Sequence, residues 1–504
     1  MGKAKEKQQY CVLTMALYPE PWQIDIIEKK FSIMEHLKNS LIAFEFRKLK
    51  NVERTKEYKN IMNSIRNESD EKVRTKLWKQ RNKILTDAGF TEFAFKDDIV
   101  PMQKHFVQHI GSNIARPMAT NVFSAFEKVL FGSGDKVSFC KKGTLNSIQN
   151  EKYGTAMRIR DGYFEWSGGE GKTKKGVKLK KITIKIKVAG PKTYYEKEML
   201  QKEIRYLRVV KKWVKNRYKY YLQFILKGNP VVKPRVIAND KRVGIDIGPS
   251  SAAISSDKEA RLVELADRVQ RNYDKKIQLQ RSMDRSRRNM NPQNFNENRT
   301  IKRGVKLTWI ESNHYKEMRG QVRELERKNA DIRKYQHICL ANYILSLGTE
   351  VYVEQMNFKG LQRRAKETKY DENGRPKKKK RFGKSIANRA PAMFITILKN
   401  KLLGIAGKEL HEVNTFTFKA SQYDHTNDDY KKKSLKDRWA ELSNGDKIQR
   451  DLYSAFLLMN SCEDMEKTNR EKCEETYERF KTLHDDLIKN MKESQKKYIK
   501  SFGL

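Results

Sequence analysis

The sequence has 504 residues, of which 107 are Lys or Arg and 62 are Asp or Glu, so its formal net charge is +45 at pH 7. A chain of this length exceeds one ordinary core, which predicts two or more domains. The positive charge is far beyond what solubility needs and predicts a polyanionic partner, with nucleic acid favoured over an anionic membrane. We find no run of about 18 apolar residues and no signal-peptide pattern. We therefore expect a cytoplasmic protein that does not contact a membrane.

The five cysteines lie far apart and form no C-x-x-C pair; they are Cys11, Cys140, Cys339, Cys462 and Cys473. This pattern predicts neither a disulfide framework nor a structural zinc site. We expect single, reduced thiols and no bound zinc.

The first 240 residues predict a strand, then helices, then β structure. Residues 8–18 are typical of a strand, and residues 24–131 are rich in Leu, Ile, Lys and Glu, as expected for helices. Residues 132–240 contain short alternating segments between Gly, Lys and Asn turns, which favours a barrel-like β-domain. The first half of the chain therefore has a mixed α and β composition.

Within that β-domain, residues 203–226 predict a hairpin in which basic and aromatic residues alternate. Such residues can hold a phosphate backbone and stack bases, but an ordinary half-buried hairpin explains the pattern equally well. The candidate nucleic-acid contacts of the hairpin are Arg205, Arg208, Trp213, Arg217 and Tyr218.

Long helices are expected over about residues 261–347. One stripe of the second helix recurs at spacings of three and four, which predicts packing on a partner helix; it contains Met318, Val322, Leu325, Asn329, Ile332, Gln336 and Cys339. Other faces carry Arg319, Arg323 and Arg327, which could line a duplex. Residues 361–385 have too few apolar residues to pack and predict a mobile basic loop, with Arg363 and Arg364 as candidate contacts.

Three acidic residues stand at the ends of apolar elements. Asp246 ends a short strand in "VGID", and Glu354 ends the apolar run in "VYVE". Asp451 opens a helix in "RDLYSAF", where the small residues Ser454 and Ala455 would let the helix approach a sheet closely. An acid at a strand end is usually a surface residue or a turn cap, so position alone does not establish a site.

Together, the three acids would supply hard oxygen ligands from two strands and a helix. Mg²⁺ and Mn²⁺ prefer such ligands to His or Cys. Two such ions could activate water and stabilise the leaving oxygen during phosphodiester cleavage. In a basic chain that collects phosphates, this pattern predicts a nuclease site.

The segments "VGIDIGPSSAAISS", "VYVEQMNFKGL" and "RDLYSAF" resemble the three split RuvC motifs of TnpB-type transposon-associated nucleases and of compact type V CRISPR effectors. The helices between the first two motifs and the segment "FTFKASQYDH" (Phe416–His425) are similar to that family as well. The likeness runs from about residue 241 to residue 460. It implies that Asp246, Glu354 and Asp451 are catalytic and bind two Mg²⁺ ions, with Mn²⁺ as a substitute.

The resemblance also implies a multi-domain α+β architecture. A wedge (oligonucleotide-binding) β-barrel would comprise residues 1–23 and 132–240, with a helical recognition domain at 24–131. A RuvC (RNase H-like) α/β nuclease domain would span 241–410, with an arginine-rich helical insertion at about 261–347. Residues 451–462 would form its final helix and residues 463–504 a helical C-terminal tail.

Residues 411–450 depart from the family pattern, because no cysteine stands where the family has a zinc ribbon. We expect a degenerate, zinc-free insert that binds target nucleic acid and is closed by packing of residues such as Leu435, Trp439 and Leu442.

The function that the resemblance implies is RNA-guided DNA cleavage. The protein would recognise a short target-adjacent motif, allow the guide to pair with double-stranded target DNA, and hydrolyse DNA in one RuvC site. The guide RNA could be transposon-encoded or a CRISPR RNA, and both a monomer and a homodimer are open. The expected location is the prokaryotic cytoplasm, at the nucleoid when DNA is bound.

Three alternatives are a nuclease-silent RNA-guided DNA-binding repressor, an acidic-triad transposase and an RNA-processing nuclease. The presence of all three acids argues against the first of these.

Overall fold

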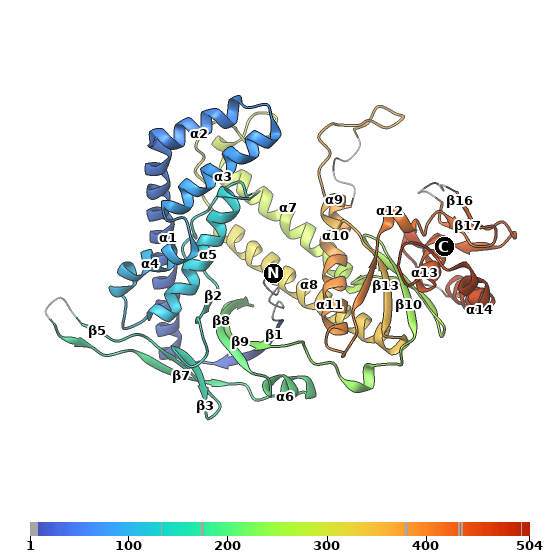
Figure 1. Cartoon of the computed structure of the whole chain (residues 1–504), viewed down its shortest axis with the longest axis horizontal. Coiled ribbons are helices and arrows are strands. Elements are labelled where there is room, and N and C mark those ends of the chain that lie inside the picture. Colours follow the sequence, from blue (N-terminus) through green and yellow to red (C-terminus); the bar gives the residue numbers. More distant parts are fainter. Residues whose placement is uncertain are drawn as a thin grey trace. The chain divides into compact units, whose positions relative to one another are not determined.

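The computed structural model describes residues 9–132, 134–172, 176–376, 379, 382–431, 434, 437–494 and 496–504. The chain forms two compact units, Met1–Gly228 and Asn229–Leu504 (Figure 1). Each unit combines helices with a sheet, so the chain is a multi-domain α+β protein.

The first unit contains a seven-stranded antiparallel sheet in the order β2-β8-β9-β1-β7-β4-β3. Its strands are β1 (Tyr10–Tyr18), β2 (Ser147–Gln149), β3 (Met157–Arg160), β4 (Tyr163–Ser167), β7 (Thr183–Val188), β8 (Ile204–Val214) and β9 (Arg217–Lys227). A separate pair joins β5 (Gly171–Lys172) to β6 (Lys178–Leu179). Strand β1 buries every second side chain, which confirms the predicted strand at residues 8–18.

The helical part of this unit follows β1 directly. Its helices are α1 (Pro21–Arg54), α2 (Lys56–Asn67), α3 (Glu71–Asp87), α4 (Glu92–Lys104) and α5 (Ser112–Leu130), with the short α6 (Tyr194–Leu200) between β7 and β8. Pro21 stands at the first position of α1, where its missing N–H costs no helical hydrogen bond. The predicted order of strand, helices and β structure is therefore confirmed.

The second unit is built on a mixed five-stranded sheet in the order β12-β11-β10-β13-β14. The strands are β10 (Arg242–Ile247), β11 (Ser251–Ser256), β12 (Ala260–Glu264), β13 (Glu350–Glu354) and β14 (Leu410–Val413). Strand β10 is antiparallel to β11 and parallel to β13, and β13 is parallel to β14. Two strands that carry candidate acids, β10 and β13, are therefore neighbours.

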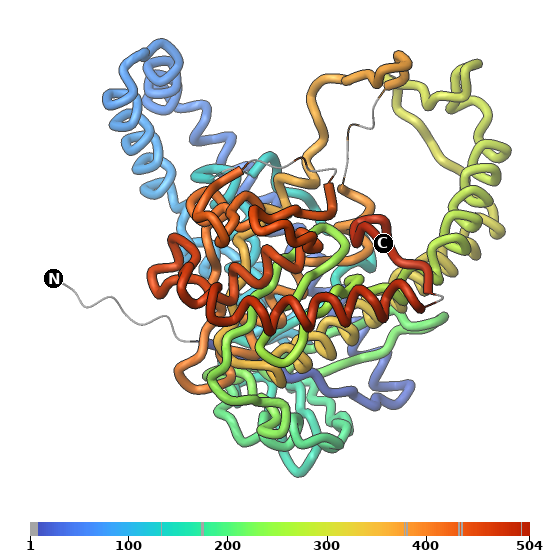
Figure 2. The backbone as a smooth tube through the Cα atoms, turned by 90° about the vertical axis from the view of Figure 1, so that its right-hand side faces the viewer, coloured from blue at the N-terminus to red at the C-terminus, as the bar shows by residue number. Residues whose placement is uncertain are grey.

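Helices cover both faces of this sheet. One face packs against α8 (Asn313–Leu347) and α11 (Pro391–Leu402), and the other against α13 (Arg450–Met459), which packs in turn on α14 (Arg470–Glu493). Figure 2 shows α14 as one long helix near the C-terminus. The shorter helices are α7 (Tyr273–Met290), α9 (Phe358–Leu361), α10 (Gly383–Arg389) and α12 (Thr415–Phe418), with 3-10 turns η1 (Pro234–Val236), η2 (Asp267–Asn272), η3 (Pro292–Asn294) and η4 (Lys500–Phe502).

Two expected boundaries were wrong. The long helices were expected to start at about residue 261, but residues 261–264 belong to β12, because they pair along the edge of β11, and α7 starts only at Tyr273. Residues 410–413 belong to the central sheet as β14, so the following insert begins later than residue 411. That insert contains two small hairpins, β15 (Tyr423–Asp424) with β16 (Asp429–Tyr430) and β17 (Trp439–Glu441) with β18 (Lys447–Gln449).

The predicted packing stripe on α8 is confirmed at its centre. Leu325 and Asn329 are buried, and Asn329 accepts a 2.8 Å hydrogen bond from Asn272. Cys339, at the end of the stripe, is exposed instead.

Within the described residues, no helix is long and apolar enough to cross a membrane.

Candidate active site and nucleic-acid surfaces

Asp246 and Glu354 occupy equivalent positions on neighbouring strands. Ile245 of β10 pairs with Val353 of β13 in the parallel register, so the next residue on each strand is one of the two acids. Ile245 and Val353 belong to the core against α8 and α11. Because side chains alternate along a strand, Asp246 and Glu354 both point to the face that α13 covers.

The third acid is placed by a close contact between α13 and β10. A Cβ atom on Gly244 would lie 1.9 Å from the carbonyl oxygen of Ala455 and 2.5 Å from the backbone nitrogen of Met459. Only glycine allows this approach. Asp451 lies about one helical turn before Ala455, and Asp246 lies two residues after Gly244 on the same face. The contact therefore brings the start of α13 to the end of β10.

The carboxyl groups influence one another electrostatically. Burial, together with the negative charges of Asp451 and Glu354, raises the pKa of Asp246 well above its usual value, while Arg450 and Arg438 act in the opposite direction. Burial also raises the pKa of Glu354 to about 7. The three acids therefore share one environment, in which Asp246 and Glu354 hold protons easily when no cation is bound.

Two arginines contact the third acid. Arg450 Nη2 lies 3.1 Å from Asp451 Oδ1, and Arg438 Nη1 lies 3.8 Å from Asp451 Oδ2. Arg450 immediately precedes Asp451, and Arg438 immediately precedes β17 of the insert. We did not foresee either arginine from the sequence, although Arg450 stands inside the "RDLYSAF" segment.

The donor set fits a divalent cation of the Mg²⁺ type. It consists of carboxylate oxygens, which such ions prefer, and two of the acids have raised pKa values that a nearby cation would lower. Among the described residues, no three His, Cys, Asp or Glu side chains already form a metal-binding group. The Asp451 carboxylate instead pairs with Arg450 and Arg438, while its charge still acts on Asp246.

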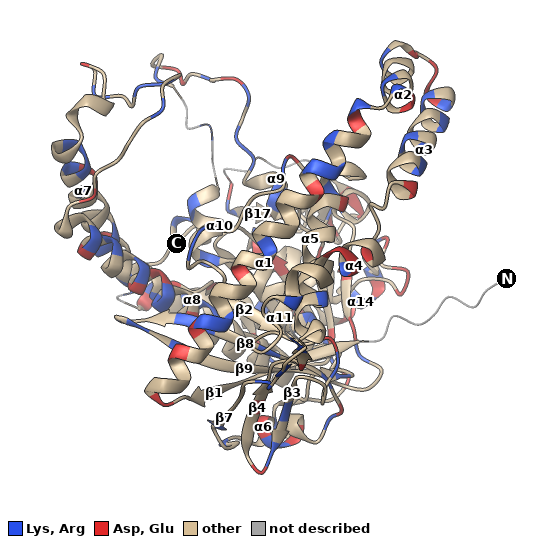
Figure 3. Ribbon diagram, turned by 90° about the vertical axis from the view of Figure 1, so that its left-hand side faces the viewer, with Lys and Arg blue, Asp and Glu red and all other residues tan. Residues whose placement is uncertain are grey.

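The β8–β9 hairpin presents a polar and aromatic outer face. Arg208 donates to Gln149 at 2.8 Å, and its guanidinium lies 5.8 Å from the ring of Tyr206. Arg205 and Arg217 are exposed. Trp213 and Tyr218 are placed differently, because they are half-buried and pack edge to face, with ring centroids 4.9 Å apart. Figure 3 shows the Lys and Arg residues of the chain in blue.

On α8, the candidate arginines have carboxylate partners. Arg319 pairs with Glu311, and Arg327 pairs with Glu324 at 2.7 Å and Asp331 at 2.6 Å. Arg323 is exposed on the same helix. Charge on α8 is therefore partly neutralised within the unit.

The basic loop and the insert complete the candidate surfaces. Arg363 and Arg364 are exposed and line a shallow hollow after α9. In the insert, Leu442 is buried and Trp439 is half-buried, whereas Leu435 lies outside the described residues.

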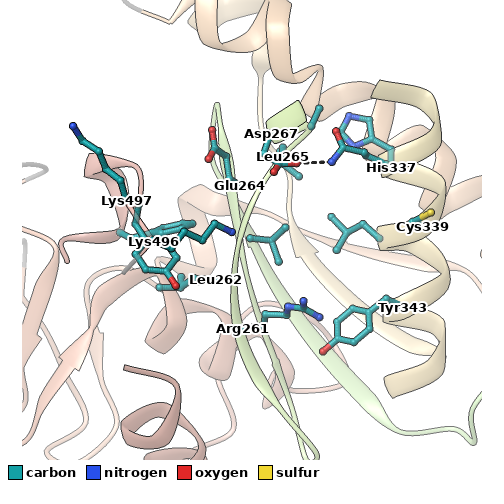
Figure 4. Close-up of a pocket in the computed structure, with 16 residues that line it drawn as sticks. Arg261, Leu262, Glu264, Leu265, Asp267, His337, Cys339, Tyr343, Lys496 and Lys497 are labelled. Atoms are coloured by element: carbon teal, nitrogen blue, oxygen red, sulfur yellow. Dashed lines mark hydrogen bonds between the residues drawn. The ribbon is translucent and has the colours of Figure 1, made fainter. Parts of the chain in front are cut away.

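A separate cavity of about 370 Å³ lies between β12, α8 and the C-terminal segment (Figure 4). Arg261 lies 4.7 Å from the ring of Tyr343, and Gln336 donates to Asp267 across one end. Lys496 contributes to the opposite wall. None of the three candidate catalytic acids lines this cavity.

No family model matches the sequence, and no curated protein matches it. Among solved structures, a Cas12f1–sgRNA–target DNA complex is 11% identical and has a TM-score of 0.47, with 90% of this chain and 99% of that chain covered. A CRISPR-Cas12f ternary complex is 11% identical with a TM-score of 0.28, covering 87% and 82%. A Cas12i–crRNA–dsDNA complex is 10% identical with a TM-score of 0.28, covering 80% and 61%. The structural neighbours are thus Cas12f and Cas12i, complexes of type V CRISPR effectors.

Proposed function

We propose that the protein is an RNA-guided DNA endonuclease that hydrolyses DNA in one RuvC-type site. The observation that carries the proposal is the convergence of Asp246, Glu354 and Asp451, two from adjacent parallel strands and one from a helix that touches β10 at Gly244. The net charge of +45 supports polyanionic partners. We propose a guide RNA and double-stranded target DNA as those partners.

In this proposal, the three acids would hold the divalent cations. The cations, once bound, supply positive charge to the transferring phosphate and activate water. Glu354 and Asp246 would release their protons as positive charge enters, because burial raises both pKa values and, for Asp246, the negative charges of Asp451 and Glu354 add to that effect. Arg450 and Arg438 restrain the Asp451 carboxylate through ion pairs at 3.1 Å and 3.8 Å.

One structural observation favours a second candidate, the nuclease-silent RNA-guided DNA-binding protein. The Asp451 carboxylate is paired with arginines, and the described residues contain no preformed metal-binding group. If that pairing persists when nucleic acid binds, the protein would bind a guided target without cutting it.

A cleavage assay separates the two candidates. The protein, purified with RNA expressed from its native flanking DNA, is given matched supercoiled target with Mg²⁺ or with EDTA. We expect Mg²⁺-dependent cleavage that Asp246→Asn reduces to the EDTA background while target binding is retained. Asp257→Asn is the matched control, because Asp257 lies just beyond β11 and pairs with Lys241. Guided binding without cleavage by the unmodified protein would establish the second candidate instead.

A further inference from the structure

The C-terminal helix α14 packs directly on the helix that carries Asp451. The rings of Phe456 in α13 and Phe480 in α14 stack with centroids 4.4 Å apart. Tyr477 and Cys473 of α14 are buried in the same core. Helix α14 is therefore an integral part of the second unit, although the proposed function assigns it no role.

One polar contact within this core reaches the start of α13. The backbone N–H of Gln449 donates to Nε2 of His484 at 3.0 Å, and both residues are at most 1% exposed. Because a backbone N–H can only donate, Nε2 of His484 must carry a lone pair. Its proton is then on Nδ1, which lies 2.8 Å from Oδ1 of Asp485. His484 is thus held as one neutral tautomer.

Gln449 is the residue at which β18 ends and α13 begins. Its side-chain Oε1 accepts from the backbone N–H of Leu452 at 2.8 Å, which caps the helix. On its other side, Gln449 pairs with Trp439 of β17, and its amide lies 3.5 Å from the carbonyl oxygen of Phe502. Together, these contacts hold Gln449, the residue two positions before Asp451.

We propose that His484 is a positioning residue for Asp451: by accepting the Gln449 N–H, it holds the strand-to-helix junction and so sets where the Asp451 carboxylate lies. The inference rests on the proposed function, since it gives the C-terminal tail a part in the same site. It requires His484 to be neutral, because a protonated ring would place an N–H against the N–H of Gln449.

Burial and the charged groups around His484 together set the pKa of its ring. Asp485 and Lys481 lie on α14, Asp446 lies in the turn between β17 and β18, and Lys492 lies over the ring of Trp439. Burial is the largest influence and lowers the pKa of His484 below its usual value. The contact is therefore present above the pKa of a free histidine and is lost as the pH falls through the lower pKa of the folded protein.

The test uses three variants of the full chain. His484→Phe keeps a ring in the core but removes the acceptor. His484→Gln keeps a neutral acceptor near the position of Nε2 but cannot titrate. Lys489→Gln, on the exposed side of the same helix, is the matched control.

Three readouts are measured, two on the guide-loaded protein and one on the protein alone. Single-turnover cleavage at saturating Mg²⁺ should fall roughly tenfold or more in His484→Phe, because small misplacements of a catalytic group are costly. Guided target binding should match Lys489→Gln. Calorimetric titration of the nucleic-acid-free protein with Mn²⁺ should show weaker binding in His484→Phe and near-normal binding in His484→Gln.

The pH profile tests the tautomer. From pH 7.5 down to the lowest pH at which both proteins stay folded, the cleavage rate of the unmodified protein should fall relative to that of His484→Gln, since other titrations affect both proteins equally. If the ratio of the two cleavage rates stays constant over this pH range, the proposal is overturned. This comparison does not need His484→Phe, so it remains decisive if that variant fails to fold.

These measurements distinguish a failure of the His484 positioning role from a failure of the proposed nuclease function. If the unmodified protein cleaves and binds Mn²⁺, but His484→Phe equals Lys489→Gln in cleavage and in Mn²⁺ binding, only the positioning role is excluded. If the unmodified protein neither cleaves nor binds Mn²⁺, the proposed function and the positioning role are both excluded.

Discussion

At the residue scale, the candidate site brings mutually repelling carboxyl groups together, and arginines hold one of them in ion pairs. Asp246 and Glu354 are placed side by side by strand register, and each makes ionisation of the site more costly. The pKa of Glu354 is raised to about 7, mainly by burial. In a chain of net charge +45, such a cluster is a local exception that a divalent cation would stabilise.

This arrangement predicts a pH-dependent gain in stability when Glu354 is neutralised. Because the pKa of the Glu354 carboxyl is higher in the folded than in the unfolded chain, its ionisation weakens folding as the pH rises from about 4.3 to about 7. In EDTA, Glu354→Gln should therefore stabilise the protein by roughly 3 kcal/mol at pH 8 and hardly at all at pH 4.5. Denaturant unfolding at both pH values measures this difference.

Asp257→Asn is the control, because that carboxylate already pairs with Lys241. An equal effect of Glu354→Gln at both pH values would contradict the assigned environment.

At the element scale, the packing of α13 on β10 decides whether the third acid joins the other two. This packing depends on the absence of a side chain at Gly244, where a Cβ would overlap the Ala455 carbonyl oxygen. Backbone atoms of a buried helix cannot move aside without displacing the whole element.

Gly244→Ala should therefore displace α13, destabilise the protein by about 2–3 kcal/mol and abolish cleavage. Thermal unfolding and the cleavage assay measure the two effects. Gly320→Ala is the matched control, because Gly320 lies in α8 with open space around its missing Cβ. Alanine there should be neutral or stabilise the helix. Normal cleavage by Gly244→Ala would rule out the close packing as the basis of the site.

The strands and helices of the chain show how much of the fold and of the candidate site could be predicted from the sequence. The apolar runs that end at Asp246 and Glu354 were recognisable as strands, and the small Ala455 indicated close packing. Other features depend on distant pairing. Residues 260–264 became a strand only because β11 offers an edge, and a register shift between Ile204 and Tyr206 lies within the β8–β9 hairpin. Likewise, the Gln449 to His484 hydrogen bond joins residues 35 positions apart and leaves no local pattern.

At the scale of the whole molecule, the two units carry different candidate functional residues. The first unit offers the hairpin with exposed Arg205 and Arg217, and the second contains the three acids. Under the proposed function, electrostatic contacts would hold nucleic acid while base pairing with the guide provides specificity. Specificity should then change with the RNA and not with the protein.

The most direct measurement is therefore an exchange of guides. The RNA that copurifies with the protein is sequenced, two guides with different variable ends are prepared on its constant part, and each complex is given both matching targets with Mg²⁺. The account predicts that each complex cleaves only the DNA that its guide matches, and that Asp246→Asn abolishes both reactions. Cleavage that ignores the guide, or that needs no RNA, would contradict it.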